Sequence, residues 1–297
     1  GSISFKTLSL RVPSAPATIE ISSIQTTTVK VSWAEVVADL KVTDYSIDYS
    51  LDGNTWLAVT KTPSLHPAIA INGLLAGRNY QVRVAAINSD GKGAYVYGTF
   101  TTMAVAPSIP LRLTAISVTN NSFTLDWNAP KDDGGSAITD YVIEVNGGGM
   151  NWKAIAHEPS ANTILTISGL LPATKYAVRV RAINNVGSSK NSDTFAVTTK
   201  PQAPNAPNGL TTKTVTSTTV SLIWVAPASG GSKITDFLVE YSSDKGATWT
   251  QATRAPSIVT NMVIKPLKPK TRYLFRVTAK NKVGYGVASS SLAVTTP

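Results

Sequence analysis

The 297 residues are enough for two or three domains of ordinary size, and 42% of them are hydrophobic, enough to form real cores. Only 15% are charged, with 27 Lys and Arg against 17 Asp and Glu. The absence of cysteine excludes disulfides, thiolate metal sites and cysteine nucleophiles, and no apolar run reaches the roughly 18 residues that a membrane span needs.

The chain begins with Gly1-Ser2, which resembles the remnant of an expression vector, and no signal peptide is visible. Residues 8–16 resemble the end of a later repeat, residues 195–207. They form either the last strand of a preceding repeat or the first strand of the first domain, and the sequence leaves both open. We assign residues 1–12 to the vector remnant and the possible end of an upstream repeat, and expect the parent protein to be longer.

Three segments then align at a spacing of 94 to 97 residues. Each has an early Trp that closes an alternating apolar run, a second Trp about 25 residues later, a Pro-Ser pair, and a Leu six residues before a Tyr. These landmarks are Trp33, Trp127 and Trp224; Trp56, Trp152 and Trp249; Pro63-Ser64, Pro159-Ser160 and Pro256-Ser257; and Leu74 with Tyr80, Leu170 with Tyr176, and Leu267 with Tyr273.

After each Tyr the chain alternates strictly between apolar and polar residues until an Asn ends the run, at Asn88, Asn184 and Asn281. A period of two is typical of half-buried strands, and about seven such runs in each repeat predict an antiparallel sandwich. Gly pairs and Asp-Gly steps supply the positive φ that the tight turns between strands need. The sequence therefore predicts an all-β fold without helices.

With these residues the chain resembles tandem fibronectin type III domains of a bacterial extracellular type. The early Trp resembles the family's strand B core residue, and the Leu and Tyr resemble its tyrosine corner. Residues 130–141 and 227–237 resemble the family's loop between strands B and C, whereas residues 36–43 lack the Gly pair. The resemblance implies three tandem immunoglobulin-like, seven-stranded β-sandwiches at 13–104, 105–200 and 201–297. It also implies a structural core that includes Trp33, Trp127, Trp224, Tyr80, Tyr176 and Tyr273.

Proline-rich segments join the repeats, at residues 105–110 and 200–207. Proline fixes φ and stiffens a short connector, so we expect the domains in an extended arrangement, as a monomer.

No catalytic constellation is visible, and we expect no enzyme, no cofactor and no metal. His66 and His157 fall in different repeats, too far apart for a His-based metal site. Asp132, Asp133 and Asp140 form the densest acidic group, interpreted as solvated turn residues or else a weak calcium contact. The Gly runs at 134–135 and 147–149 are interpreted as hairpin turns, because no helix follows them to form a phosphate loop.

Two features are candidates for binding. The second Trp of each repeat is either a structural cover stacked on an Arg, at Arg83, Arg179 and Arg276, or a ligand platform. Residues 201–297 carry 11 basic and 3 acidic side chains, so nearly all the basic excess lies in the third repeat. The possible partner surface there comprises Trp249, Lys265, Lys268, Lys270, Arg272, Arg276, Lys280 and Lys282, either solvated or in contact with an anionic polymer.

We therefore expect a non-catalytic spacer or adhesion segment of a bacterial cell-surface or secreted protein. It would interact with protein or carbohydrate partners at the cell surface, without inserting in a membrane and without binding nucleic acid. Two alternatives stay open: an accessory region of a polysaccharide-degrading enzyme, and direct binding of an anionic cell-wall polymer through the third repeat.

Overall fold

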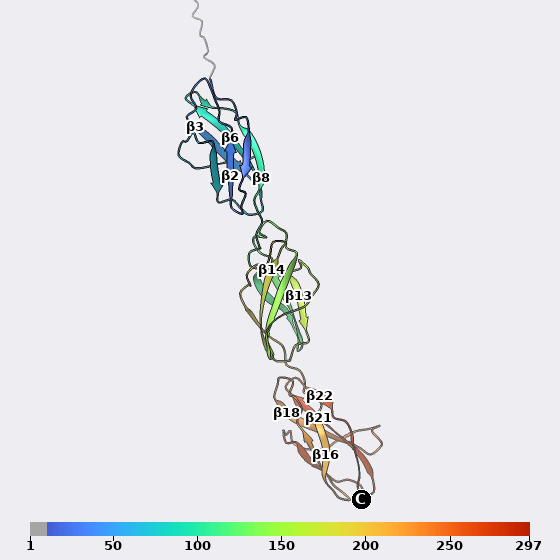
Figure 1. Ribbon diagram of the computed structural model, residues 1–297. Helices are drawn as coiled ribbons and strands as arrows, with labels where there is room; N and C mark the ends of the chain where they lie inside the picture. The colour runs from blue at the N-terminus through green and yellow to red at the C-terminus, as the bar shows by residue number, and fades with distance from the viewer. Residues whose placement is uncertain (1–10) are drawn as a thin grey trace, which may run out of the picture.

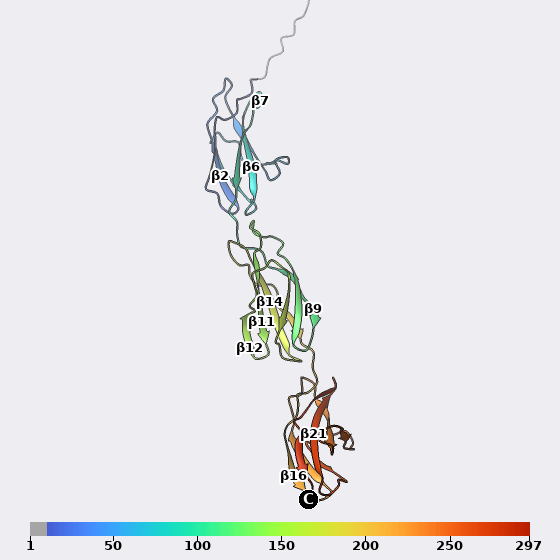
Figure 2. The same ribbon diagram turned by 90° about the vertical axis from the view of Figure 1, so that its right-hand side faces the viewer.

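The computed structural model describes residues 11–297, and it consists of three β-sandwiches placed end to end (Figure 1). The view turned by 90° also shows the three domains in one extended line, so the molecule is rod-shaped (Figure 2). Residues 11–297 contain strands and turns but no helix, and hence no helix with the length and apolarity to cross a membrane. The all-β fold with three sandwiches in an extended arrangement is confirmed.

The first domain pairs a sheet of order β1-β2-β5 with a second sheet in which β4, β3, β6 and β7 are neighbours and β8 also pairs with β6. Its strands are β1 (Ile19–Ser22), β2 (Thr28–Trp33), β3 (Asp44–Ser50), β4 (Leu57–Ala58), β5 (Ala68–Asn72), β6 (Asn79–Asn88), β7 (Gly91–Lys92) and β8 (Val96–Thr101).

The second domain has seven strands, with sheet orders β13-β10-β9 and β12-β11-β14-β15. They are β9 (Leu111–Val118), β10 (Ser122–Asn128), β11 (Asp140–Gly147), β12 (Met150–Ala154), β13 (Ile164–Ser168), β14 (Lys175–Ile183) and β15 (Phe195–Thr198).

The third domain repeats the first, with sheet order β16-β17-β20 and a second sheet of β19-β18-β21-β22 in which β23 also pairs with β21. In both domains the seventh strand position is divided in two, at β7 and β8 and at β22 and β23. The strands are β16 (Asn208–Val215), β17 (Val220–Val225), β18 (Ile234–Ser242), β19 (Thr250–Gln251), β20 (Asn261–Ile264), β21 (Arg272–Asn281), β22 (Tyr285–Ala288) and β23 (Leu292–Thr295).

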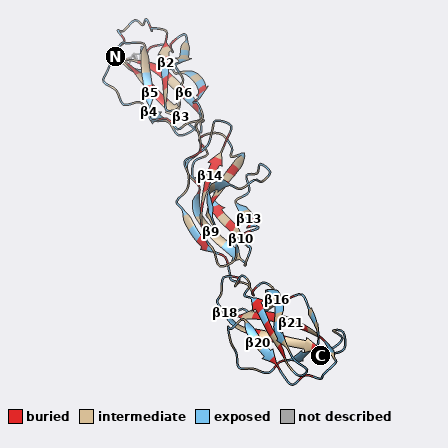
Figure 3. Cartoon of the chain, turned by 60° about the horizontal axis from the view of Figure 1, so that its bottom comes forward, coloured by how far each residue is buried: buried red, intermediate tan, exposed pale blue. Residues whose placement is uncertain are grey.

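Each domain has its own core between its two sheets, where the buried residues gather (Figure 3). In the second domain, Trp127 of β10 meets Tyr141 of β11 edge to face, with ring centroids 5.3 Å apart. Equivalent pairs join the two sheets of the other domains, Trp33 with Tyr45 at 5.2 Å and Trp224 with Phe237 at 5.5 Å. Such large aromatic pairs contribute burial and a preferred geometry at once.

A tyrosine corner closes one end of each sandwich. The Tyr176 hydroxyl accepts a hydrogen bond from the amide of Leu171 at 2.9 Å, and Tyr80 and Tyr273 do the same for Leu75 and Lys268. The three Tyr and the three strand B Trp are all at most 6% exposed. The corner therefore ties the turn before the sixth strand position to the core.

Most of the N-terminal segment singled out in the sequence, residues 1–10, lies outside the described residues. Residues 11–16 form no strand, but the carbonyl of Arg11 accepts a hydrogen bond from Asn88 Nδ2 at 2.7 Å.

Candidate functional site

The joints between the domains contain networks of hydrogen bonds made by buried or partly buried side chains. At each of the two joints, the exit turn of one domain meets the entry loop of the next. The exit turn precedes the sixth strand position of the upstream domain, at residues 73–78, 169–174 and 265–271. The entry loop crosses between the sheets of the downstream domain, at residues 34–43, 129–139 and 226–233.

Asn184 fixes the first joint from the downstream side. Its Nδ2 donates to the carbonyls of Val105 in the linker, at 2.7 Å, and of Asp133 in the entry loop, at 2.8 Å. Its Oδ1 accepts from the amides of Val186 and Gly187 at 2.9 and 3.0 Å. The side chain is only 3% exposed, so the amide satisfies polar backbone that water does not reach.

Asn281 repeats this arrangement at the second joint. Its Nδ2 donates to the carbonyls of Gln202 and Ser229 at 2.7 and 2.8 Å, and its Oδ1 accepts from Val283 at 2.8 Å. Asn88 holds the carbonyl of Arg11 in the first domain in the same way. Each Asn therefore fixes the incoming linker to the end of a central strand.

At the first joint the two domains approach backbone to backbone. A Cβ atom on Gly135 of the entry loop would lie 2.2 Å from Cα of Gly77 in the exit turn, and one on Gly77 would lie 2.4 Å from Cα of Gly135. Both residues have positive φ, +79° and +60°. A side chain at either position would force the domains apart, so glycine is required here for closeness as well as for conformation.

The second joint uses the same two segments with a small side chain on one of them. A Cβ on Gly231 would lie 2.1 Å from Cβ of Ala173 in the upstream exit turn. In addition, Asn120 Nδ2 donates to Gln202 Oε1 at 2.7 Å, which connects the upstream domain to the linker.

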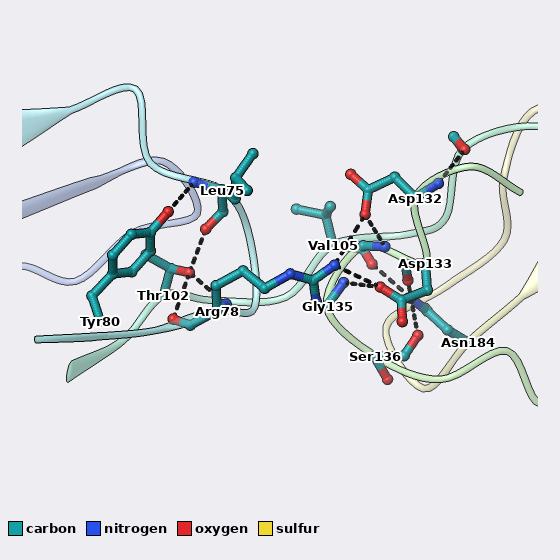
Figure 4. A network of polar contacts seen from close by, with 12 residues as sticks. Leu75, Arg78, Tyr80, Thr102, Val105, Asp132, Asp133, Gly135, Ser136 and Asn184 are labelled. Carbon is teal, nitrogen blue, oxygen red and sulfur yellow. Dashed lines mark hydrogen bonds and ion pairs between the residues drawn. The ribbon is translucent and has the colours of Figure 1, made fainter. Parts of the chain in front are cut away.

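The first joint also carries an ion pair across the domains, drawn in Figure 4. Arg78 Nη2 lies 3.3 Å from Asp133 Oδ1 and 3.7 Å from Asp132 Oδ1. The amide of Gly135 donates to Asp133 Oδ1 at 2.8 Å. The Gly135 amide, with Arg78 as a further cause, holds the pKa of Asp133 below its usual value.

These contacts change the interpretation of several residues. The Gly run at 147–149 lies in a hairpin turn between β11 and β12, but the run at 134–135 joins strands of different sheets, so its interpretation as a hairpin was wrong. Asp140 accepts a hydrogen bond from the amide of Ser160 at 3.0 Å, whereas Asp133 contacts Arg78 and Gly135. Among residues 11–297 no three His, Asp or Glu side chains gather as a metal site would require.

The second Trp of each domain lies under the Arg of the central strand. The guanidinium carbon of Arg276 is 4.0 Å from the ring centroid of Trp249, and Arg276 Nε donates to Glu240 at 2.8 Å. Arg83 on Trp56 and Arg179 on Trp152 have the same distance of 4.1 Å. One face of each partly buried indole is thus covered by the protein's own cation.

The basic residues singled out in the third domain divide into two groups. Lys265, Lys268, Lys270 and Arg272 are exposed around the exit turn, at the start of β21. Lys280 and Lys282 lie at its far end, about 30 Å away for a ten-residue strand. Lys280 Nζ contacts the ring of Tyr285 at 4.7 Å, and Arg276 is stacked on Trp249 between the two groups. The sequence placed these residues around one corner and one strand, and the length of that strand separates the two groups.

Sequence reasoning noted the three Asn at the strand ends but did not assign their role. Their repetition at the same step of each repeat was the available signal.

The fold, the tyrosine corners and the Asn contacts together define the class of protein: a tandem array of antiparallel β-sandwiches whose linkers are held by buried Asn side chains. The family model described as "Fibronectin type III domain" matches residues 14–101, 106–198 and 205–296, and the chain belongs to this family.

The relatives include titin of Drosophila melanogaster, 30% identical over 92% of this chain and 2% of its own length. They also include the M-protein of striated muscle of Gallus gallus, 30% identical, and human myomesin-2, 29% identical, each over 94% of this chain and 20% of its own length. The chain thus spans a fifth or less of these relatives.

Among solved structures, the FN1–FN3 domains of chicken CNTN1 match with a TM-score of 0.51 at 20% identity, covering 96% of this chain and 99% of that one. At this identity the match shows the fold alone.

Proposed function

We propose that this chain is a spacer whose two joints hold the three domains in fixed relative orientations. The observation that carries the proposal is the repeated joint: Asn184 and Asn281 each bind one linker carbonyl and one entry-loop carbonyl. These contacts hold the linker against the downstream domain, so fewer residues are free to rotate between the two domains than in a linker whose backbone hydrogen-bonds only to water.

The close glycine contacts support the same function. Backbone atoms of Gly77 and Gly135 meet across the first joint, and Gly231 meets Ala173 across the second. Orientation is set by the fit of these backbone segments and by the buried Asn amides, with proline limiting the linker.

We place the spacer outside the cell or on its surface, with protein partners, in the manner of many domains of this family. The muscle relatives point to a second setting, an intracellular scaffold, in which the same joints would serve. Surface labelling of intact cells distinguishes the two, since only an external segment reacts with a membrane-impermeant reagent. Bacterial origin stays a prediction, as these relatives are animal proteins.

Distance measurements between spin labels test the fixed joints. The chain has no cysteine, so Lys30→Cys with Lys153→Cys reports on the first joint, and Lys153→Cys with Lys213→Cys on the second. All three positions are exposed. Both pairs are expected to give narrow distance distributions. Broad distributions in both would refute the proposal while leaving the individual folds intact.

A second function is favoured by the exposed cations around the exit turn of the third domain: binding of an anionic polymer such as a cell-wall polyanion. Co-sedimentation with insoluble wall polymer at rising salt tests it, with Lys270→Gln and Arg272→Gln as the variants. No retention at low salt rules it out. Service as an accessory region of a polysaccharide-degrading enzyme would require a catalytic domain in the same parent protein.

A further inference from the structure

The exit turn of the third domain has the same geometry as the two exit turns that form joints. Lys270 occupies the position of Gly77 and Ala173, and all three residues have positive φ, at +51°, +60° and +47°. Their amides donate to the outgoing chain, at the carbonyls of Pro297, Met103 and Lys200. The turn before β21 is therefore shaped as the upstream half of a joint.

In the two joints within the chain, this position is where the neighbouring entry loop sits. Gly77 touches Gly135, and Ala173 touches Gly231. The second contact shows that a residue with a Cβ is accepted on the upstream side as long as the downstream residue is glycine. Lys270 has a Cβ and the backbone conformation of Ala173, so it can occupy the upstream side of a joint whose downstream residue is glycine.

The charge around Lys270 indicates the kind of loop that fits. Lys245, Lys270 and Arg272 line one hollow of about 440 Å³, together with Thr271 and Leu274. Within residues 11–297 none of these three cations takes part in an ion pair. At the first joint a single cation, Arg78, faces two carboxylates, Asp132 and Asp133, in the entry loop.

We propose that the Lys270 surface, comprising Lys245, Lys270, Thr271 and Arg272, docks a fibronectin type III domain whose entry loop carries acidic residues and a glycine pair. The loop at residues 132–135 is the example of such a partner in this chain. The proposal rests on the proposed function, since it extends the same joint to a further domain. Like charges would repel a basic entry loop, and the cations therefore select among possible neighbours.

A fusion protein tests this proposal. Residues 104–200 are appended directly after Pro297, because Pro297 occupies the position of Met103 in the hydrogen bonds of the exit turn. The appended domain has its own core, and the short connection gives its acidic loop a high effective concentration at Lys270. Spin labels at Lys213→Cys and at Lys153→Cys of the appended domain report on the new joint.

The expected result is a narrow distribution for the new joint, as narrow as that of the first joint measured with Lys30→Cys and Lys153→Cys. Lys270→Glu in the fusion should broaden it, because the new carboxylate repels the acidic loop. Lys282→Glu makes the same charge change at the opposite end of β21 and should leave the distribution narrow.

A broad new joint beside a narrow first joint would overturn the docking proposal and leave the spacer function standing. Broad distributions at both joints would instead count against the spacer function itself. Binding of dextran sulfate, a soluble polyanion, tests whether the Lys270 surface is covered by the appended domain or stays open to a polyanion. Docking predicts that the fusion binds it at least several-fold more weakly than the original chain, and equal affinity would show that the cations stay accessible, against the proposal.

Discussion

Arg78 in the first domain and Asp133 in the second face each other across the first joint, with Nη2 3.3 Å from Oδ1. The second joint, within the described residues, has a neutral contact in the comparable role, between Asn120 and Gln202 at 2.7 Å. Two joints with the same backbone arrangement therefore differ in their electrostatics, and conditions that act on charge should separate them.

Acid is expected to loosen the first joint before the second. The Gly135 amide and Arg78 lower the pKa of Asp133 from 3.8, so its stabilising contribution is complete above that value. It is lost as the pH falls below 3.8 and through the lowered pKa, and the label pair across the first joint should broaden over that range. Equal broadening at both joints, with tryptophan fluorescence showing folded domains, would contradict this.

Salt should weaken the attraction between Arg78 and Asp133, with a smaller effect on the first joint than acid has. Both side chains are roughly two-fifths exposed, and such pairs contribute at most about 1 kcal/mol. At about 1 M salt the first joint should resemble that of Arg78→Gln, because screening removes most of the attraction. A salt response that persists unchanged in Arg78→Gln would show that another contact is responsible.

Gly135→Ala is expected to displace the second domain from the first. The new Cβ would lie 2.2 Å from Cα of Gly77, and neither backbone can move without opening the joint. Gly169→Ala is the matched control, since Gly169 has a similar φ, +74°, but open space around it. Both variants should lose about 1 kcal/mol of stability from backbone strain, and only Gly135→Ala should change the distance across the joint. An unchanged distance would show that the close contact is dispensable.

Asn184→Ala should destabilise the second domain and broaden the first joint. It leaves two carbonyls and two amides without their partner in a buried position, which costs about 2–3 kcal/mol in urea unfolding. Asn185→Ala removes the same side chain from the adjacent, exposed position and should cost less than about 0.5 kcal/mol. Similar losses in the two variants would refute the assigned role of Asn184.

Lys245→Gly should be more stable than Lys245→Ala by about 1 kcal/mol. Lys245 has φ of +62° in the turn after β18, directly before Gly246, whose φ is +94°. Alanine keeps the crowding between Cβ and the backbone, whereas glycine removes it. Urea unfolding of the third domain, followed by Trp249 fluorescence, measures the difference, and equal midpoints would show that the turn is unstrained.

The fold was predictable because the sequence patterns that indicate it lie within short segments of the chain. Alternation with a period of two identified the strands, and the Leu and Tyr six residues apart marked the corner in which Tyr176 accepts the amide of Leu171. Positive φ at Gly134 and Gly135 also followed from their turn chemistry.

The joints were not predictable in the same way, because their contacts connect residues far apart in the chain. Asn184 binds a carbonyl 79 positions earlier, and Gly135 meets a glycine in another domain. A polar residue that ends a strand gives no local sign of such a partner. The basic residues were placed around one corner and one strand, but the sequence did not indicate how far the ten-residue strand separates their two groups.

The central strands β6, β14 and β21 each begin at a tyrosine corner, and a linker-binding Asn is the last residue of β6 and β21 and directly follows β14. One strand per domain thus connects the anchorage of the incoming chain to that of the outgoing chain. When the ends of the molecule are pulled, the covalent chain transmits tension into the outer strands, and the side chains of the three Asn offer a second route from the linkers to the central strands. Resistance to stretching should therefore depend on these three amides.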